Sequence, residues 1–134
     1  MKIDGGCYCG QIRYTVEGDI AAQMQCHCRE CQYITGGNPN VFIMVPETTF
    51  SYVKGEASSF SRPDLDNPVT RFFCANCGTA IGTKAPGAPG AMVLKVGTLD
   101  DPSIFTPSVA IFTKESQSFH HIPEGVTDFD GLPG

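Results

Sequence analysis

Cys26-His27-Cys28-Arg29-Glu30-Cys31 places three thiols within six residues, and the rest of the chain can be interpreted as the frame that holds them. Cys28 and Cys31 form a Cys-x-x-Cys loop, to which Cys26 adds a third sulfur two residues earlier. Structural zinc sites are closed tetrahedra of four protein ligands, whereas catalytic zinc sites use three and leave one position open. The stretch therefore predicts an open zinc site with Cys26, Cys28 and Cys31 as metal ligands and catalytic residues.

The other four of the seven cysteines form two short pairs, Cys7-Tyr8-Cys9-Gly10 and Cys74-Ala75-Asn76-Cys77-Gly78. Glycine after the second thiol supplies backbone angles that other residues reach only at a cost, as a tight metal knuckle requires. Two knuckles that face each other enclose one tetrahedral Zn²⁺ even when many residues separate them. We therefore expect a structural zinc, which connects the first strand to the middle of the chain. Its predicted ligands are Cys7, Cys9, Cys74 and Cys77.

A second partition of the cysteines stays open on spacing alone. It joins the Cys-x-x-Cys loop of the central stretch to the later Cys-x-x-Cys pair as a zinc ribbon. We favour the first partition because the ribbon would leave the N-terminal Cys-x-Cys pair without a role. It would also separate Cys26 from its neighbours.

Three thiolates around one Zn²⁺ leave a net negative charge, which weakens the metal as a Lewis acid. We therefore expect capture of a substrate thiolate or polarisation of a small carbonyl rather than strong activation of water. His27 alternates away from Cys26 and Cys28 in a strand, so we interpret it as a surface residue or a support for the ligands. His120 or His121 of the tail would close the site if either supplied a fourth ligand, and the enzyme interpretation would then weaken.

Two further features bear on substrate binding. Arg29, inside the central loop, is a candidate for a two-pronged contact to a substrate carboxylate, with a solvated loop charge as the alternative. The segment 84–90, rich in Gly, Pro and Ala, is a candidate lid over the open site. We favour an ordinary surface loop for it.

The chain has 134 residues, of which 41% are hydrophobic, and a formal charge of −5 from 9 basic and 14 acidic residues. This length predicts one zinc-binding domain over residues 1–134. The acidic balance excludes nucleic acid, which needs a basic face, and anionic membranes as partners. The chain has no apolar run of about eighteen residues and no apolar signal region before the first cysteine pair, so we expect a cytoplasmic protein.

Cysteines in a cytoplasmic protein favour metal or redox chemistry, because disulfides persist in oxidising compartments. A thioredoxin-like site places its Cys-x-x-Cys at the strand-to-helix turn of a βαβ unit, which neither pair here is expected to occupy. The spacings typical of ferredoxins are also absent. We therefore favour metal binding.

The pattern of turns predicts a mainly β protein with little helix. Fifteen glycines and ten prolines interrupt the chain, and no stretch sustains the apolar spacing of a long helix. We expect one helical turn at 31–35, and the continuously apolar run 41–45 should be a buried central strand. Four apolar residues are expected to anchor the polar tail after 115, namely Phe119, Ile122, Val126 and Phe129. The other predicted strands are 11–16, 20–25, 50–53, 57–61, 69–73, 79–82, 91–96 and 108–113.

With these motifs placed, the sequence resembles the glutathione-dependent formaldehyde-activating enzymes, the GFA family. The resemblance implies an Mss4-like fold of several antiparallel β-sheets with zinc knuckles. It also implies a structural zinc at the two knuckles and a catalytic zinc at the central cluster. The motifs that carry it are Gly6-Cys7-Tyr8-Cys9-Gly10, Arg13-Tyr14, Cys26-His27-Cys28-Arg29-Glu30-Cys31, Val45-Pro46, Phe50, Gly55-Glu56, Arg71-Phe72-Phe73-Cys74-Ala75-Asn76-Cys77-Gly78, Gly97-Thr98-Leu99-Asp100-Asp101-Pro102 and Gly131-Leu132-Pro133.

The resemblance implies a zinc-dependent carbon–sulfur lyase that joins formaldehyde to glutathione as S-hydroxymethylglutathione. The expected partners are a small thiol and an aldehyde, and the expected cofactors are two Zn²⁺ ions, the second of them labile. The chain departs from the family at Ala110, where members often carry histidine, and at Phe119, where they carry tryptophan. The competing hypothesis is a non-catalytic zinc-binding module that grips a protein partner.

Overall fold

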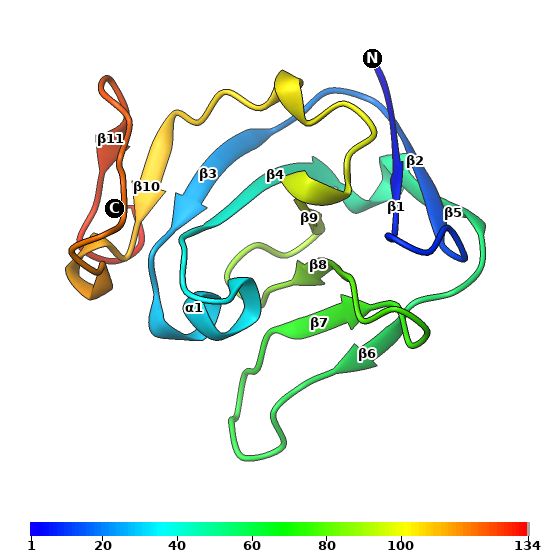
Figure 1. Ribbon diagram of the computed structural model, residues 1–134, viewed down its shortest axis with the longest axis horizontal. Helices are drawn as coiled ribbons and strands as arrows, with labels where there is room; N and C mark the ends of the chain where they lie inside the picture. Colours follow the sequence, from blue (N-terminus) through cyan, green and yellow to red (C-terminus); the bar gives the residue numbers. More distant parts are fainter. Residues whose placement is uncertain (134) are drawn as a thin grey trace.

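The computed structural model describes residues 1–133, and within them it has two β-sheets, one α-helix and four short 3-10 helices. In Figure 1 the smaller sheet lies at one side of the molecule, and the strands β10 (Val109–Ile111) and β11 (Thr127–Asp128) lie at the opposite side. The smaller sheet has the order β1-β2-β5, made by β1 (Lys2–Gly6), β2 (Arg13–Glu17) and β5 (Phe50–Lys54).

The larger sheet has the order β11-β10-β3-β4-β9-β8-β7-β6. The α-helix, α1 (Arg29–Thr35), connects β3 to β4, and among the 3-10 helices η2 (Val96–Thr98) follows β9 and η4 (Thr113–Glu115) follows β10. The other two are η1 (Glu47–Thr49) and η3 (Pro102–Ile104). The strands of the larger sheet are β3 (Ala22–Cys26), β4 (Asn40–Pro46), β6 (Ser58–Phe60), β7 (Thr70–Phe73), β8 (Ala80–Lys84), β9 (Ala91–Lys95), β10 (Val109–Ile111) and β11 (Thr127–Asp128).

The prediction of a mainly β fold with little helix is confirmed. Its pairings are antiparallel, as expected, except that β10 runs parallel to both β3 and β11. Parallel pairing needs a long connection, and the chain between β3 and β10 supplies it, because six strands lie between them in sequence. No helix in the described part of the chain is long and apolar enough to span a membrane.

The central strand β4 is apolar on both of its faces. Ile43 and Val45 are fully buried in the main core with residues of both sheets, whereas Phe42 lies in a second cluster that includes Cys26. Because successive side chains of a strand point to opposite faces, one face of the larger sheet covers the main core and the other face reaches the central cysteines. The predicted buried strand at 41–45 is therefore confirmed.

The first strand, β1, was not predicted, because two of its five residues are glycines and lie directly before the first knuckle. Gly5 is extended and pairs with Tyr14 of β2, whose ring is fully buried and whose hydroxyl lies 2.7 Å from Thr98 Oγ1. A Cβ on Gly5 would lie only 2.4 Å from the Tyr14 hydroxyl and from the carbonyl oxygen of Thr98. Glycine is required here because of this close approach, not because of a turn.

Gly5→Ala is expected to lower the free energy of unfolding by about 1–3 kcal/mol, the usual cost of overpacking a well-packed core. Urea unfolding followed by circular dichroism measures this loss. Gly87→Ala is the matched control, because a Cβ at Gly87 meets nothing within 4 Å. Equal stability of the two variants would contradict the close packing of Tyr14 on β1.

The tail after η4 folds back beside β10, where the Phe129 N–H donates to the carbonyl of Ala110 at 2.9 Å. Ile122, Val126 and Phe129 are half-buried, as expected of anchors. Phe119 is 65% exposed, so its predicted role as an anchor is wrong. Its ring instead stacks edge-on against His120, whose side chain contacts the carbonyl of Gly37 after α1.

Candidate metal centre

Two turns that are 64 residues or more apart in sequence bring four thiols together. The sulfur atoms of the two predicted knuckles all lie within 4.8 Å of one another, and Cys7 and Cys74 are buried. Gly10 and Gly78 follow the second thiol of each pair in the left-handed region, with φ of 82° and 79°. In each knuckle the N–H of that glycine donates to the carbonyl of the first cysteine, which closes the turn.

Hydrogen bonds to two thiols of this four-thiol cluster, Cys7 and Cys77, favour their thiolate forms. The Ile12 N–H donates to Cys7 Sγ at 3.2 Å. The Thr79 hydroxyl lies 3.1 Å from Cys77 Sγ, and this contact, with the Thr79 backbone N–H, lowers the pKa of Cys77 to about 6. Four thiolates in a tetrahedral arrangement select zinc or an iron–sulfur centre, and the donor set fits a closed zinc site.

The other three thiols meet where β3 ends and α1 begins. Cys26 is the last residue of β3, Cys28 is the N-cap of α1, and Cys31 lies in its first turn. Their sulfur atoms also lie within 4.8 Å of one another. Cys28 and Cys31 group with Cys26, not with the later pair, so the zinc-ribbon partition does not describe this fold.

The helix α1 begins two residues earlier than the predicted turn at 31–35. The Cys31 N–H donates to Cys28 Sγ at 3.3 Å, so a candidate metal ligand also caps the helix. The Cys-x-x-Cys loop therefore occupies a strand-to-helix turn, but not one of the βαβ kind that the sequence analysis excluded. The strands on either side, β3 and β4, are antiparallel, so the turn is not part of a thioredoxin-like βαβ unit.

Electrostatics within the three-thiol cluster concentrate charge on one sulfur. Hydrogen bonds from the Cys26 and Cys31 thiols lower the pKa of Cys28 to about 2, whereas the bonds to Cys28 and Cys31 raise the pKa of Cys26. The cluster alone thus holds one thiolate readily and opposes a second. A divalent cation removes this opposition, so three sulfur donors at this spacing fit a zinc ion.

No fourth His, Cys, Asp or Glu atom within residues 1–133 joins the three-thiol cluster. His120 Nε2–H donates to the carbonyl of Gly37 at 2.8 Å, and its Nδ1 lies 3.0 Å from His27 Nδ1. His121 is exposed. His27 is fully buried, so the interpretation of it as a surface residue is wrong, and its Nε2 lies 3.1 Å from Gln25 Oε1.

A cleft of about 550 Å³ opens at the three-thiol cluster, and Cys26, Cys28 and Cys31 all line it. Residues 85–88 line it as well. The segment 84–90, expected to be an ordinary surface loop, is therefore part of the cleft. The apolar wall of the cleft is formed by Met24, Phe42, Met44, Val93 and Ile111.

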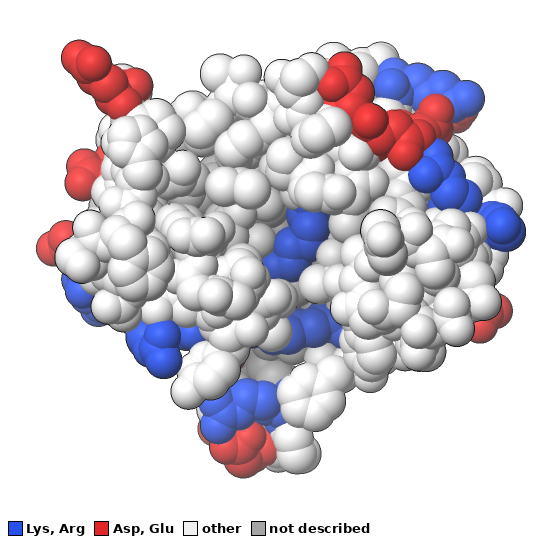
Figure 2. Space-filling model, viewed as in Figure 1, with Lys and Arg blue, Asp and Glu red and all other residues white. Residues whose placement is uncertain are grey.

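Arg29 was the basic residue that the sequence analysis proposed for substrate binding, but two other basic residues also lie at or near the cleft. Arg29 lines the cleft, but its guanidinium donates to Gln32 Oε1 and lies 5.1 Å from the centre of the Tyr33 ring. Arg71 also lines the cleft, and Lys95 is buried nearby on β9. Lys95 interrupts the otherwise apolar run 91–96, which was predicted to be a strand. Because buried lysines are rare, this position could have been singled out from the sequence. Figure 2 shows basic side chains within the central hollow of a largely uncharged face.

The model of the family described as glutathione-dependent formaldehyde-activating enzyme (GFA) matches residues 2–115 of the chain. This chain belongs to the GFA family. The matched region contains both cysteine clusters and every strand except β11. The resemblance carried by the cysteine motifs is thereby confirmed.

The fold of this GFA protein is shared with a solved structure. The crystal structure of a Rhodobacter sphaeroides protein, a structural genomics target, superposes with a TM-score of 0.60 at 19% sequence identity. The match covers 72% of this chain and 87% of the other. Two cysteine clusters on such a fold fit a zinc-binding member of the GFA family.

Proposed function

We propose that this chain is a carbon–sulfur lyase that joins a small aldehyde such as formaldehyde to a thiol such as glutathione, and that also cleaves the product. One observation carries the proposal: the three-thiol cluster lines an open cleft and has no fourth protein ligand within residues 1–133. An interaction module would need no cleft at this cluster. The name of the family supplies the substrates, formaldehyde and glutathione.

The reaction is balanced without an oxidant or a reductant. The thiol sulfur bonds to the carbonyl carbon, the C=O π electrons move to oxygen, and the thiol proton ends on that oxygen. Zn²⁺ bound by Cys26, Cys28 and Cys31 would hold a substrate thiolate or polarise the aldehyde oxygen. Cleavage of the product reverses these changes.

The protein itself would position the three thiols and exclude water from the cleft around them. The apolar wall of the cleft, from Met24 to Ile111, lowers the local dielectric constant around the thiols, which strengthens each polar contact made there. Gln32, 4% exposed, donates from its Nε2 to the carbonyls of His27 and Glu115 at 2.9 and 3.0 Å. These bonds hold the start of α1, and with it Cys28 and Cys31, against the segment that follows β10.

Zinc analysis combined with kinetics tests this proposal. We expect two Zn²⁺ ions per chain, one of which mild chelation removes because only three protein ligands hold it. The rate of exchange between glutathione, formaldehyde and their adduct, measured by NMR above the uncatalysed rate, should disappear with that ion and return when zinc is restored. A single tightly held ion and no catalysed exchange would instead support the zinc-binding interaction module.

A further inference from the structure

Lys95 is a buried lysine with no carboxylate partner among residues 1–133, and the negative charges that act on it are those of the three-thiol cluster. It lies on the same face of β9 as Val93, the face that reaches the cysteine cleft. Its Nζ donates to the neutral Asn40 Oδ1 at 2.9 Å, and the side chain is 9% exposed. No ion pair among residues 1–133 includes it. An ammonium group has three donors, so this lysine has further capacity for an acceptor.

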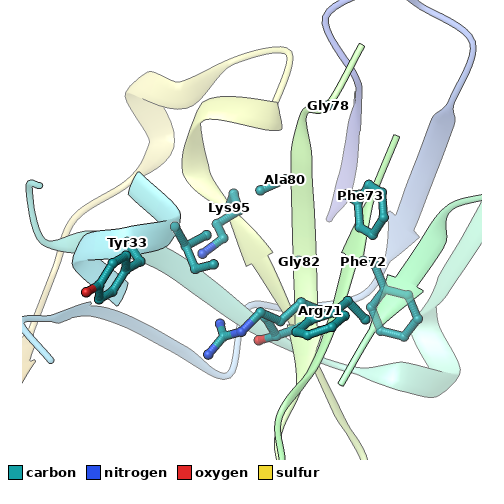
Figure 3. A pocket seen from close by; sticks show the side chains of 11 residues that line it. Tyr33, Arg71, Phe72, Phe73, Gly78, Ala80, Gly82 and Lys95 are labelled. Carbon is teal, nitrogen blue, oxygen red and sulfur yellow. The ribbon is translucent and has the colours of Figure 1, made fainter. Parts of the chain in front are cut away.

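Arg71, on β7, faces the same space. Its side chain is 19% exposed and pairs with the more exposed Glu30 through one nitrogen, at 3.3 Å. Figure 3 shows the Lys95 amine and the Arg71 guanidinium extending toward the gap between β7 and Tyr33 of α1. A guanidinium has five donors in a planar fork that matches a carboxylate. Within residues 1–133 the Arg71 guanidinium makes one hydrogen bond, to Glu30, so it has further capacity to bind a carboxylate.

Both cations line a second cavity, of about 310 Å³, next to the cysteine cleft. Arg71 and Thr83 line the cavity and the cleft alike, so the two spaces adjoin at these two side chains. Tyr33, Phe60 and Phe72 give the cavity apolar walls. A molecule whose sulfur lies at the three-thiol cluster therefore has a route for an acidic end toward two cations.

We propose that Arg71 and Lys95 form an anion subsite that binds a carboxylate of the thiol substrate and so selects acidic thiols over neutral ones. The identity of the ligand as a thiol rests on the function proposed above. The anion subsite itself rests on the two cations, their burial and their shared cavity. Arg29 is not assigned this role, because its guanidinium is held by Gln32 and the Tyr33 ring.

Binding of S-methylglutathione tests the subsite without any turnover, because its blocked sulfur cannot react. Calorimetric titration of the zinc-loaded wild-type protein should give measurable affinity, which Arg71→Gln and Lys95→Met should each weaken about 10- to 100-fold. Arg62→Gln and Lys54→Met are the matched controls, since both residues are exposed and neither lines the cavity or the cleft. Zinc content and the thermal unfolding midpoint identify a variant that has lost its fold. If Lys95→Met does not fold, the binding result for Arg71→Gln alone decides whether the subsite exists.

Kinetics with two thiols separate this inference from the proposed function. In both variants the KM for glutathione should rise by a similar factor, while turnover of 2-mercaptoethanol, which has no carboxylate, should stay the same. Normal binding and normal KM in folded Arg71→Gln would overturn the subsite and leave the lyase proposal intact. Loss of S-methylglutathione binding in a protein whose wild type catalyses no exchange would support the subsite and overturn the lyase. Equal loss in the control variants would show a non-specific charge effect and overturn the subsite.

Discussion

Cys28→Ser is expected to reduce catalysed formation of the thiol–formaldehyde adduct by more than about 100-fold. Loss of a residue that merely supports a metal ligand already costs about 10- to 100-fold, and Cys28 is itself one of the three proposed ligands. Its low pKa makes it the sulfur that carries charge most readily in the cluster. Serine does not replace that thiolate, because its hydroxyl stays protonated.

The substitution is chosen to spare the fold. Cys28 is the N-cap of α1 and accepts from the Cys31 N–H, and serine is among the best residues at that position. We therefore expect an unchanged thermal midpoint, one Zn²⁺ ion per chain in place of two, and loss of the catalysed NMR exchange. A folded Cys28→Ser protein with full activity would contradict the assignment of the reaction to this cluster.

Cys77→Ser is expected to have the largest effect on stability. The four-thiol cluster joins the turn after β1 to the turn between β7 and β8, so it ties the smaller sheet to the larger one. Structural zinc contributes about 10–16 kcal/mol of apparent binding free energy in small domains, whereas a whole domain is stable by about 5–15 kcal/mol. Loss of one of the four ligands should therefore leave the protein largely unfolded at 37 °C.

Circular dichroism melting and zinc analysis measure this loss, and hydrogen exchange shows where it begins. We expect the amides of β1 and β2 to lose protection first, because the smaller sheet contains the N-terminal knuckle. Cys28→Ser is the matched control, since it also removes one zinc ligand but from the open cluster. If Cys77→Ser melted within a few degrees of Cys28→Ser, the closed cluster would not be the element that stabilises the fold.

Local sequence patterns predicted the strands well where apolar residues alternate along a strand or fill it completely. Arg13–Glu17 alternates between half-buried and buried residues, and the run 41–45 lies in the middle of the larger sheet. The knuckle at Cys74 to Gly78 was predicted with the strands on either side of it, and these form the β7–β8 hairpin. These signals lie within a few residues of one another, so no distant contact is needed to interpret them.

Other features depend on partners far away in sequence. β1 forms over two glycines because Tyr14 and Thr98 pack too closely for any Cβ at Gly5, which no local propensity reveals. The exposure of Phe119 and the burial of His27 depend on the path of the tail, where His120 rather than Phe119 reaches the body. The place of residues 85–88 at the cleft likewise depends on how β8 and β9 lie against α1.

The sequence by itself determined the family and the mainly β class, and it favoured one division of the seven cysteines into groups of four and three. These follow from residue types at short spacings, where chain geometry leaves few arrangements. Only the tertiary structure decided which thiols meet, that no histidine within residues 1–133 closes the three-thiol cluster, and that Arg71 and Lys95 face a common cavity. The meeting of the two knuckles and the shared cavity of Arg71 and Lys95 involve side chains far apart in sequence, whose distance is set by sheet packing, and packing is a property of the whole fold.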